Sequence, residues 1–188
     1  LDEEQSMFKA CCMKLVCNGC SLASPKRGMR DCPFCRTPTP DEGQGLAMIQ
    51  KRVDAGDPVA ILHLGSSYHY GQHSLEKDVA RAVELYERAA ELGVKDAHYN
   101  LGVLYHEGTD VTDVEKDSAK AICHWEAAAM RGHVQARFNL GFEGGRAGNR
   151  DIALQHFLIG VNLGDQDSLG IVKKIFMRSG IGSYVKVS

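Results

Sequence analysis

The second half of the chain repeats itself, and this repetition limits the possible folds more than any other feature. One segment recurs at steps of 37 and 39 residues, as AILHLGSSY at 60–68, AHYNLGVLY at 97–105 and ARFNLGFEG at 136–144. A second segment recurs beside it at steps of 39 and 32 residues, as ARAVELYERAAELG, AKAICHWEAAAMRG and DIALQHFLIGVNLG. Recurrence at this length is typical of stacked units that are each too small to bury an apolar face alone.

The first segment has the pattern of an amphipathic helix. Ala97, Leu101, Leu104 and Tyr105 follow one another at i, i+4, i+7 and i+8, which is one face of an α-helix. Each copy also has a glycine inside this helix, where glycine costs about 0.5–1 kcal/mol relative to alanine. These glycines are Gly65, Gly102 and Gly141. We expect a neighbouring helix to approach closely at each of them.

The second segment predicts a partner helix. Its apolar face is formed by Ala82, Tyr86, Ala89 and Ala90, and the aromatic position recurs as Trp125 and Phe157, so we expect these rings in the core. Good N-cap residues stand before the three copies, and a glycine ends each one. The caps are Asp78, Asp117 and Asn149, and the glycines are Gly93, Gly132 and Gly164. Each repeat is therefore predicted to be an antiparallel helix pair.

The combined pattern, A-x-x-x-L-G-x-x-Y-x-x-G and then D-x-x-K-A-x-x-W/Y-x-x-A-A-x-x-G, resembles the Sel-1-like repeat, a relative of the tetratricopeptide repeat. The resemblance covers residues 57–164. It implies an all-α fold, a right-handed α-solenoid of antiparallel helix pairs, whose concave face binds a protein or peptide. In the third copy Gly144 replaces the tyrosine, Ala147 replaces the next glycine, and the loop is seven residues shorter, so we expect a tighter hairpin there.

Outside the repeats we expect two capping helices. Residues 41–56 are interpreted as a linker and a capping helix over 46–55, and residues 165–188 as a second capping helix over 166–178 with a tail. His124 and His156 share one repeat position, where the first repeat has Leu85. This register indicates an ordinary position on a helix face and not a metal pair.

Six of the seven cysteines lie within residues 11–36, and residues 37–45 then form a boundary rich in proline and glycine. The six cysteines form two C-x-x-C pairs, Cys17/Cys20 and Cys32/Cys35, and one adjacent pair, Cys11/Cys12. Because a C-x-x-C turn directs two thiolates to one point, the two C-x-x-C pairs alone would complete a tetrahedral Zn²⁺ shell. A disulfide framework needs an oxidising compartment and a thioredoxin-type pair needs a βαβ context, and the sequence indicates neither. We therefore predict a small zinc module over residues 1–40.

The string CCMKLVCNGC…CPFCR also resembles the latter three quarters of a RING-type zinc finger. Lys14 stands where many RING fingers carry a ligand histidine, so the all-cysteine variant is the better match. By this resemblance, Cys11 and Cys12 share one zinc ion with Cys32 and Cys35. The sequence thus leaves two arrangements open, this one and the single site built from the two C-x-x-C pairs.

The RING resemblance has two further implications. Cys17 and Cys20 would share a second zinc ion with an opening C-x-x-C pair, which we expect upstream of Leu1 in a truncated N-terminal portion, because no cysteine precedes the adjacent pair. Pro33 and Arg36 occupy the positions that, in RING ubiquitin ligases, contact a ubiquitin-conjugating enzyme and steady the donor ubiquitin. Alternatively, Pro33 only shapes the turn and Arg36 is a solvated cation.

Composition excludes several other classes of function. A formal charge of −2 gives no basic footprint for nucleic acid, and no apolar run is long enough to span a membrane. The chain begins without a signal-peptide pattern, so we expect a reducing compartment, cytoplasmic or nuclear. No phosphate-binding loop or nucleophile elbow occurs, so hydrolase or dehydrogenase chemistry has no motif to support it.

These observations favour a zinc-binding interaction protein. In the leading hypothesis the RING-like module recruits a ubiquitin-conjugating enzyme and the repeats select a protein substrate, so that ubiquitin transfer occurs without covalent catalysis by this chain. The alternative is a non-enzymatic adaptor, or scaffold, in which zinc is purely structural.

Overall fold

The structure is a computed structural model that describes residues 6–26, 28, 31–38, 40, 42–108 and 115–178. It contains two compact units, Leu1–Val94 and Lys95–Ser188. The boundary between them falls at the junction of the first and second repeats, and the two units are described in turn.

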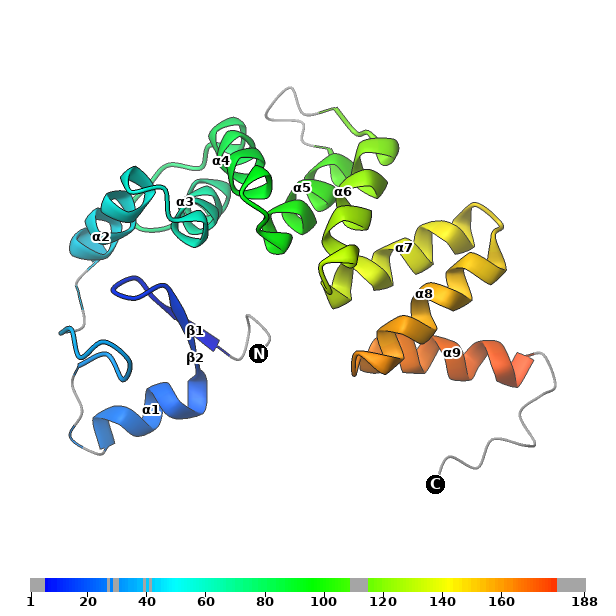
Figure 1. The fold of residues 1–188 in the computed structure, drawn as a ribbon, viewed down its shortest axis with the longest axis horizontal. Helices are drawn as coiled ribbons and strands as arrows, with labels where there is room; N and C mark the ends of the chain where they lie inside the picture. The colour runs from blue at the N-terminus through cyan, green and yellow to red at the C-terminus, as the bar shows by residue number, and fades with distance from the viewer. Residues whose placement is uncertain are drawn as a thin grey trace. The chain divides into compact units, whose positions relative to one another are not determined.

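The first unit opens with a β-hairpin that the all-α prediction did not include. Strand β1 (Ser6–Lys9) pairs antiparallel with β2 (Lys14–Cys17), with Phe8 opposite Leu15, and β2 leads directly into helix α1 (Asn18–Lys26) (Figure 1). Four-residue strands are too short to give a clear alternating pattern, so the periodicity of the sequence does not reveal them.

From Glu42 onward the first unit is helical. This part consists of α2 (Glu42–Asp54), α3 (Pro58–Tyr70) and α4 (Val79–Glu91), with α2 packed on α3 and α3 on α4. The capping helix predicted over 46–55 is present, but it begins at Glu42. Helices α3 and α4 form the first predicted pair.

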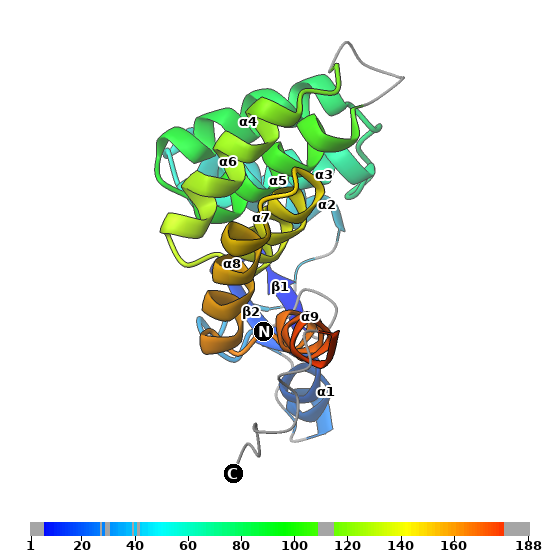
Figure 2. The same ribbon diagram turned by 90° about the vertical axis from the view of Figure 1, so that its right-hand side faces the viewer.

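The second unit holds the other two predicted pairs and a last helix. These are α5 (Lys95–Glu107) with α6 (Ser118–Met130), α7 (Val134–Arg146) with α8 (Arg150–Asn162), and then α9 (Gln166–Arg178). Helix α9, seen nearly end-on in Figure 2, packs on α8 and matches the capping helix predicted over 166–178. The predicted tail after it lies outside the described residues.

The three in-helix glycines each face an aromatic ring of the partner helix. A methyl group placed on Gly65 would lie 2.9 Å from the ring of Tyr86, and one on Gly141 would lie 2.7 Å from the ring of Phe157. At Gly102 the overlap, with the indole of Trp125, would be greater. The expected close approach is therefore confirmed, and the group that approaches is an aromatic side chain.

Two of the three predicted N-cap side chains form a capping hydrogen bond. Asp78 accepts a hydrogen bond from the N–H of Arg81 at 2.9 Å, and Asp117 accepts one from the N–H of Lys120 at 3.0 Å. Asn149 stands at the same position but its side chain makes no capping bond. Gly93, Gly132 and Gly164 end their helices with φ of 85°, 78° and 89°, in the left-handed conformation that the sequence predicts.

The third hairpin is tighter, as expected. Three residues connect α7 to α8, and a methyl group on Gly144 would lie 3.3 Å from the backbone nitrogen of Ala153. The glycine that replaces the repeat tyrosine thus lets the start of α8 approach α7. In the first two repeats the left-handed residue is the glycine at the position of Ala147. In the third repeat it is the next residue, Gly148, which has φ of 80°.

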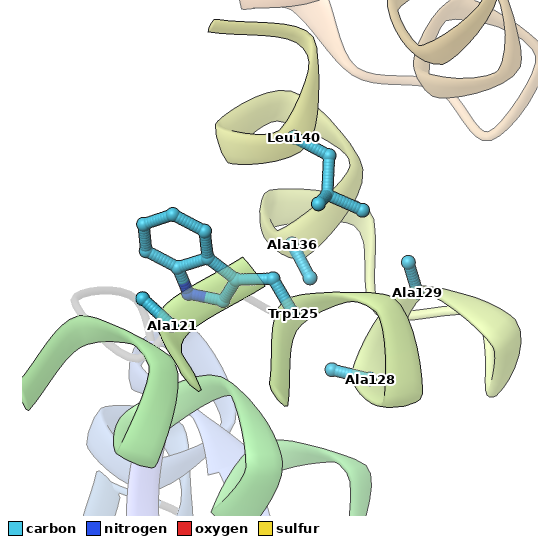
Figure 3. Close-up of a cluster of buried hydrophobic side chains, with 6 residues drawn as sticks. All are labelled: Ala121, Trp125, Ala128, Ala129, Ala136 and Leu140. Atoms are coloured by element: carbon cyan, nitrogen blue, oxygen red, sulfur yellow. The ribbon is translucent and has the colours of Figure 1, made fainter. Parts of the chain in front are cut away.

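Small alanine side chains surround the large aromatic ring in the core of the second repeat. In the second repeat Trp125 lies in a cluster with small residues of α6 and with Leu140 of α7 (Figure 3). The six members are Ala121, Trp125, Ala128, Ala129, Ala136 and Leu140, and none is more than 5% exposed.

Helix α9 has the sequence register of the first helix of a repeat. Ser168, Val172 and Phe176 occupy the positions that Ala97, Leu101 and Tyr105 hold in α5. Ser168 is fully buried, and a methyl group on Gly160 of α8 would lie 2.5 Å from its Oγ. In the α6–α7 junction two alanines, Ala128 and Ala136, occupy the corresponding positions. Serine and glycine together keep the same number of side-chain heavy atoms as those two alanines.

We predict that alanine at the aromatic-facing glycines destabilises the protein although it favours a helix. Gly141→Ala should lower the free energy of unfolding by about 1–3 kcal/mol, because the added methyl overlaps with the Phe157 ring. Gly170→Ala is the matched control: it lies in α9 with no heavy atom within 4 Å of the added methyl. It should raise stability by about 0.5–1 kcal/mol. Equal effects in urea unfolding would contradict the packing argument.

A second prediction concerns the pair between α8 and α9. Gly160→Ala alone should destabilise, whereas Ser168→Ala alone should be neutral or stabilising, because the buried Ser168 hydroxyl has no hydrogen-bond partner within the described chain. The double variant recreates the alanine pair of the α6–α7 junction. We expect a coupling energy of about 0.5–3 kcal/mol in a double-mutant cycle, and simple additivity would refute the contact.

Candidate metal centre

Four of the six N-terminal cysteines converge on one point. The Sγ atoms of Cys11, Cys12, Cys32 and Cys35 all lie within 4.8 Å of one another, and those of Cys12 and Cys32 are 3.6 Å apart. In a tetrahedral Zn²⁺ site with bonds of 2.3 Å, neighbouring sulfur atoms are separated by about 3.8 Å. None of the four thiols forms a disulfide, so each can offer its sulfur atom to a metal ion. Their spacing fits such a shell.

Two tight turns bring these cysteines together. Cys11 and Cys12 lie in the turn of the β-hairpin, where the N–H groups of Cys12 and Met13 both donate to the carbonyl of Lys9, at 3.1 and 2.8 Å. Met13 has φ of 53°, so the chain reverses sharply just after the adjacent pair.

The second turn carries the C-P-x-C pair. The N–H of Arg36 donates to the carbonyl of Cys32 at 3.0 Å, and the N–H of Cys32 donates to the carbonyl of Thr37 at 2.8 Å. Arg36 has φ of 61°. This closed loop buries Cys32 and leaves Cys35 at the surface, so the candidate centre has one inner and one outer ligand from this pair.

The protonation of the four thiols is uneven. Hydrogen bonds from the hydroxyl and the backbone of Thr37 lower the pKa of Cys35 to about 6. Burial, together with the thiols of Cys35 and Cys32, raises the pKa of Cys11, and burial also raises that of Cys12. Four adjacent thiolates repel one another, and a bound divalent cation would offset half of their charge and favour ionisation of all four.

Cys17 and Cys20 are not part of this group. They lie at the junction of β2 and α1, where the N–H of Cys20 donates to Sγ of Cys17 at 3.3 Å. Hydrogen bonds from the Cys20 side chain and backbone lower the pKa of Cys17. Within the described ranges no further cysteine, histidine or carboxylate joins them to make a group of three. The arrangement built from the two C-x-x-C pairs is thus not the one in this structure.

The other two predicted site residues lie in the C-P-x-C turn. Pro33 is half-buried between the ligands, and Arg36 is exposed immediately after Cys35. Phe34 is 49% exposed, and the ammonium group of Lys14 lies 5.1 Å from the centroid of its ring. A cation and an apolar ring are therefore presented beside the candidate centre.

Sequence reasoning missed the contacts between this module and the first repeat. Arg52 of α2 donates to the carbonyl of Cys11 at 3.0 Å and pairs with Asp57 at 3.2 Å. Asp57 in turn caps α3 by accepting from the N–H groups of Val59 and Ala60. Only Asp57, directly before Pro58, carries a sequence signal, that of a helix N-terminus.

An aromatic stack makes the second contact. The ring of Phe8 in β1 lies on the imidazole of His63 in α3, with the ring centroids 3.4 Å apart. Burial, with a smaller contribution from His73, lowers the pKa of His63 to about 4, so this imidazole is neutral at pH 7. The hairpin is thus held to the helical part by a hydrogen bond and by a ring stack.

Comparison with known families and structures identifies the helical part. The family model described as Sel1 repeat matches residues 58–94, 95–133 and 134–165, which together are more than half of the chain. These are the three predicted repeats, with nearly the predicted bounds. A comparison with curated proteins finds no match.

Two solved structures are similar to this chain. A Sel1 repeat protein from Oxalobacter formigenes is 28% identical with a TM-score of 0.67, over 78% of this chain and 60% of that one. A protective antigen of uropathogenic Escherichia coli with an SLR fold is 26% identical with a TM-score of 0.68, over 77% of this chain and 31% of that one. This chain thus spans less than two thirds of either. No helix among the described residues is long and apolar enough to cross a membrane.

Proposed function

Because the chain belongs to the Sel1 repeat family, we propose that it is a protein-interaction scaffold whose repeats bind a protein partner and whose N-terminal module binds Zn²⁺. We further propose that this module recruits a ubiquitin-conjugating enzyme, as a RING-type ubiquitin ligase does. The observation that carries the proposal is the convergence of four thiols on one point from two separate turns. The same four cysteines are those that the RING resemblance assigns to one zinc ion.

Zinc would supply folding energy to a module that has little core of its own. Between residues 6 and 40, Val16 and Cys32 are the buried apolar residues that the structure describes. A segment of this size usually needs a metal ion or disulfides to stay folded. Cys11, Cys12, Cys32 and Cys35 would hold the ion, and it would fix the hairpin turn against the C-P-x-C turn.

Ubiquitin transfer would need no nucleophile from this chain. A RING-type module increases the rate by restricting the orientation of the thioester that joins ubiquitin to its conjugating enzyme, which is an effect of positioning. Pro33 and Arg36 would make the contacts, since they occupy the matching positions beside the last two cysteines. The exposure of Arg36 and Phe34 supports this role, because both are accessible to a partner.

The adaptor alternative is compatible with a single zinc site. Cys17 and Cys20 find no other ligands within the described residues, so this part of the chain contains one four-cysteine group and not two. An adaptor needs only that one site, because its zinc ion has a structural role. The two functions therefore differ in ubiquitin transfer and agree in zinc binding.

We predict that the purified protein contains zinc bound to the four-cysteine group. Cys32→Ser should release this zinc and unfold the N-terminal module, because Cys32 is the buried ligand of the set. Cys123→Ser is the matched control, since Cys123 is an exposed thiol on α6, and it should retain the full zinc content. Elemental analysis with circular dichroism provides the measurement. A metal-free wild-type protein with an ordered module would exclude the site.

We also predict self-ubiquitination by the zinc-loaded full chain in the presence of a suitable ubiquitin-conjugating enzyme. Arg36→Ala should slow the transfer about tenfold or more, because a charge-assisted hydrogen bond is worth about 1.5–3 kcal/mol. Lys26→Ala removes another exposed cation of the same module and should have little effect. If the zinc-loaded protein is inactive across a panel of conjugating enzymes, the adaptor function is correct.

A further inference from the structure

Two histidines face each other across the second helix pair. His98 lies on α5 and His124 on α6, and their Nδ1 atoms are 3.2 Å apart. The ring centroids are 5.5 Å apart with an interplanar angle of 40°. Both side chains are half-buried, so the helices hold the two rings in place while part of each residue remains exposed to solvent.

The repeat architecture places these two rings. His98 follows Ala97, which is fully buried, and His124 precedes Trp125, whose indole packs on Gly102. The same two positions hold Ile61 and Leu85 in the first repeat, both buried and apolar. In the third repeat they hold Arg137 and His156, and the charge of Arg137 acts on His156. Of the three repeats, the second has a nitrogen lone-pair donor at both positions.

The separation of the nitrogen atoms fits shared coordination of a metal ion. In a tetrahedral site with Zn–N bonds of 2.0–2.1 Å, two imidazole nitrogens lie about 3.3 Å apart. Imidazole is a good ligand for Zn²⁺, Ni²⁺ and Cu²⁺. We propose that His98 and His124 form a two-histidine site for a divalent transition-metal ion, bridging α5 and α6 and independent of the cysteine group.

The surroundings allow this site to bind a metal at neutral pH. Burial and the presence of His124 lower the pKa of His98, and burial with the charge of Lys120 lowers that of His124, so both rings are neutral near pH 7. In the metal-free protein one Nδ1 must carry a proton and donate it in a hydrogen bond to the other Nδ1. On metal binding that proton moves to Nε2 of the same ring through water, so two neutral rings release no net proton.

The same surroundings make the site exchangeable rather than structural. Arg131 acts on His98 and Lys120 on His124, and these positive charges oppose a bound cation. The ring of Tyr105 stacks on His124 with the centroids 5.7 Å apart, which fixes the plane of the imidazole. Water would complete the coordination shell.

The test uses Ni²⁺ and the full chain without a histidine tag, followed by NMR of the histidine rings. Substoichiometric Ni²⁺ should broaden the signals of His98 and His124 before those of the other six histidines. His124→Leu and His98→Arg place at each position the residue of another repeat, and both should weaken binding at least about tenfold. His156→Leu is the matched control and should leave the broadening unchanged.

Because individual histidines are observed, zinc binding by the cysteines does not affect the result. Two variants are used so that a folding defect in one, seen by circular dichroism, leaves the other as the test. The proposal is wrong if Ni²⁺ broadens all histidines alike, or if the broadening of the remaining ring persists in a folded His124→Leu or His98→Arg variant.

Discussion

The contact of an aromatic ring with a glycine backbone is the interaction on which the helical part depends. It occurs in each repeat, with Tyr86, Trp125 and Phe157 as the rings, and each ring is at most 4% exposed. A side chain on the facing helix would hold the two backbones apart and remove this burial. Glycine inside a helix is unfavourable by itself, so its presence three times is explained by the packing that it allows.

The sequence predicts this architecture well because the repeat presents every signal three times. The spacing of Ala97, Leu101 and Tyr105 defines one helix face, and the glycines at the ends define the turns, so helix pairs and a tighter third hairpin could be foreseen. Departures from the pattern were harder to interpret. Gly160 and Ser168 stand where the α6–α7 junction has two alanines, and only the structure shows that they contact each other and that the two changes compensate.

Prediction was weaker in the cysteine module for a physical reason. The residues that a metal ion gathers are set by where turns place them and not by periodicity, so spacing alone left two ligand sets open. The structure groups the adjacent cysteines with the C-P-x-C pair. The stack of Phe8 on His63 and the facing of His98 with His124 have no signal in the sequence, because each joins residues that are distant along the chain. The two strands have none because each is only four residues long.

The bridge made by Arg52 has a consequence for where this protein can be divided. Composition changes near residue 40, which suggests two modules that could be separated or exchanged. Yet Arg52 links a backbone group of one candidate zinc ligand to the residue that caps the first repeat helix, and Phe8 covers His63 of the same helix. A cut at residue 40 would leave the guanidinium without one acceptor and would uncover an imidazole ring. The compact unit therefore extends from the hairpin to Val94, across the boundary that composition marks.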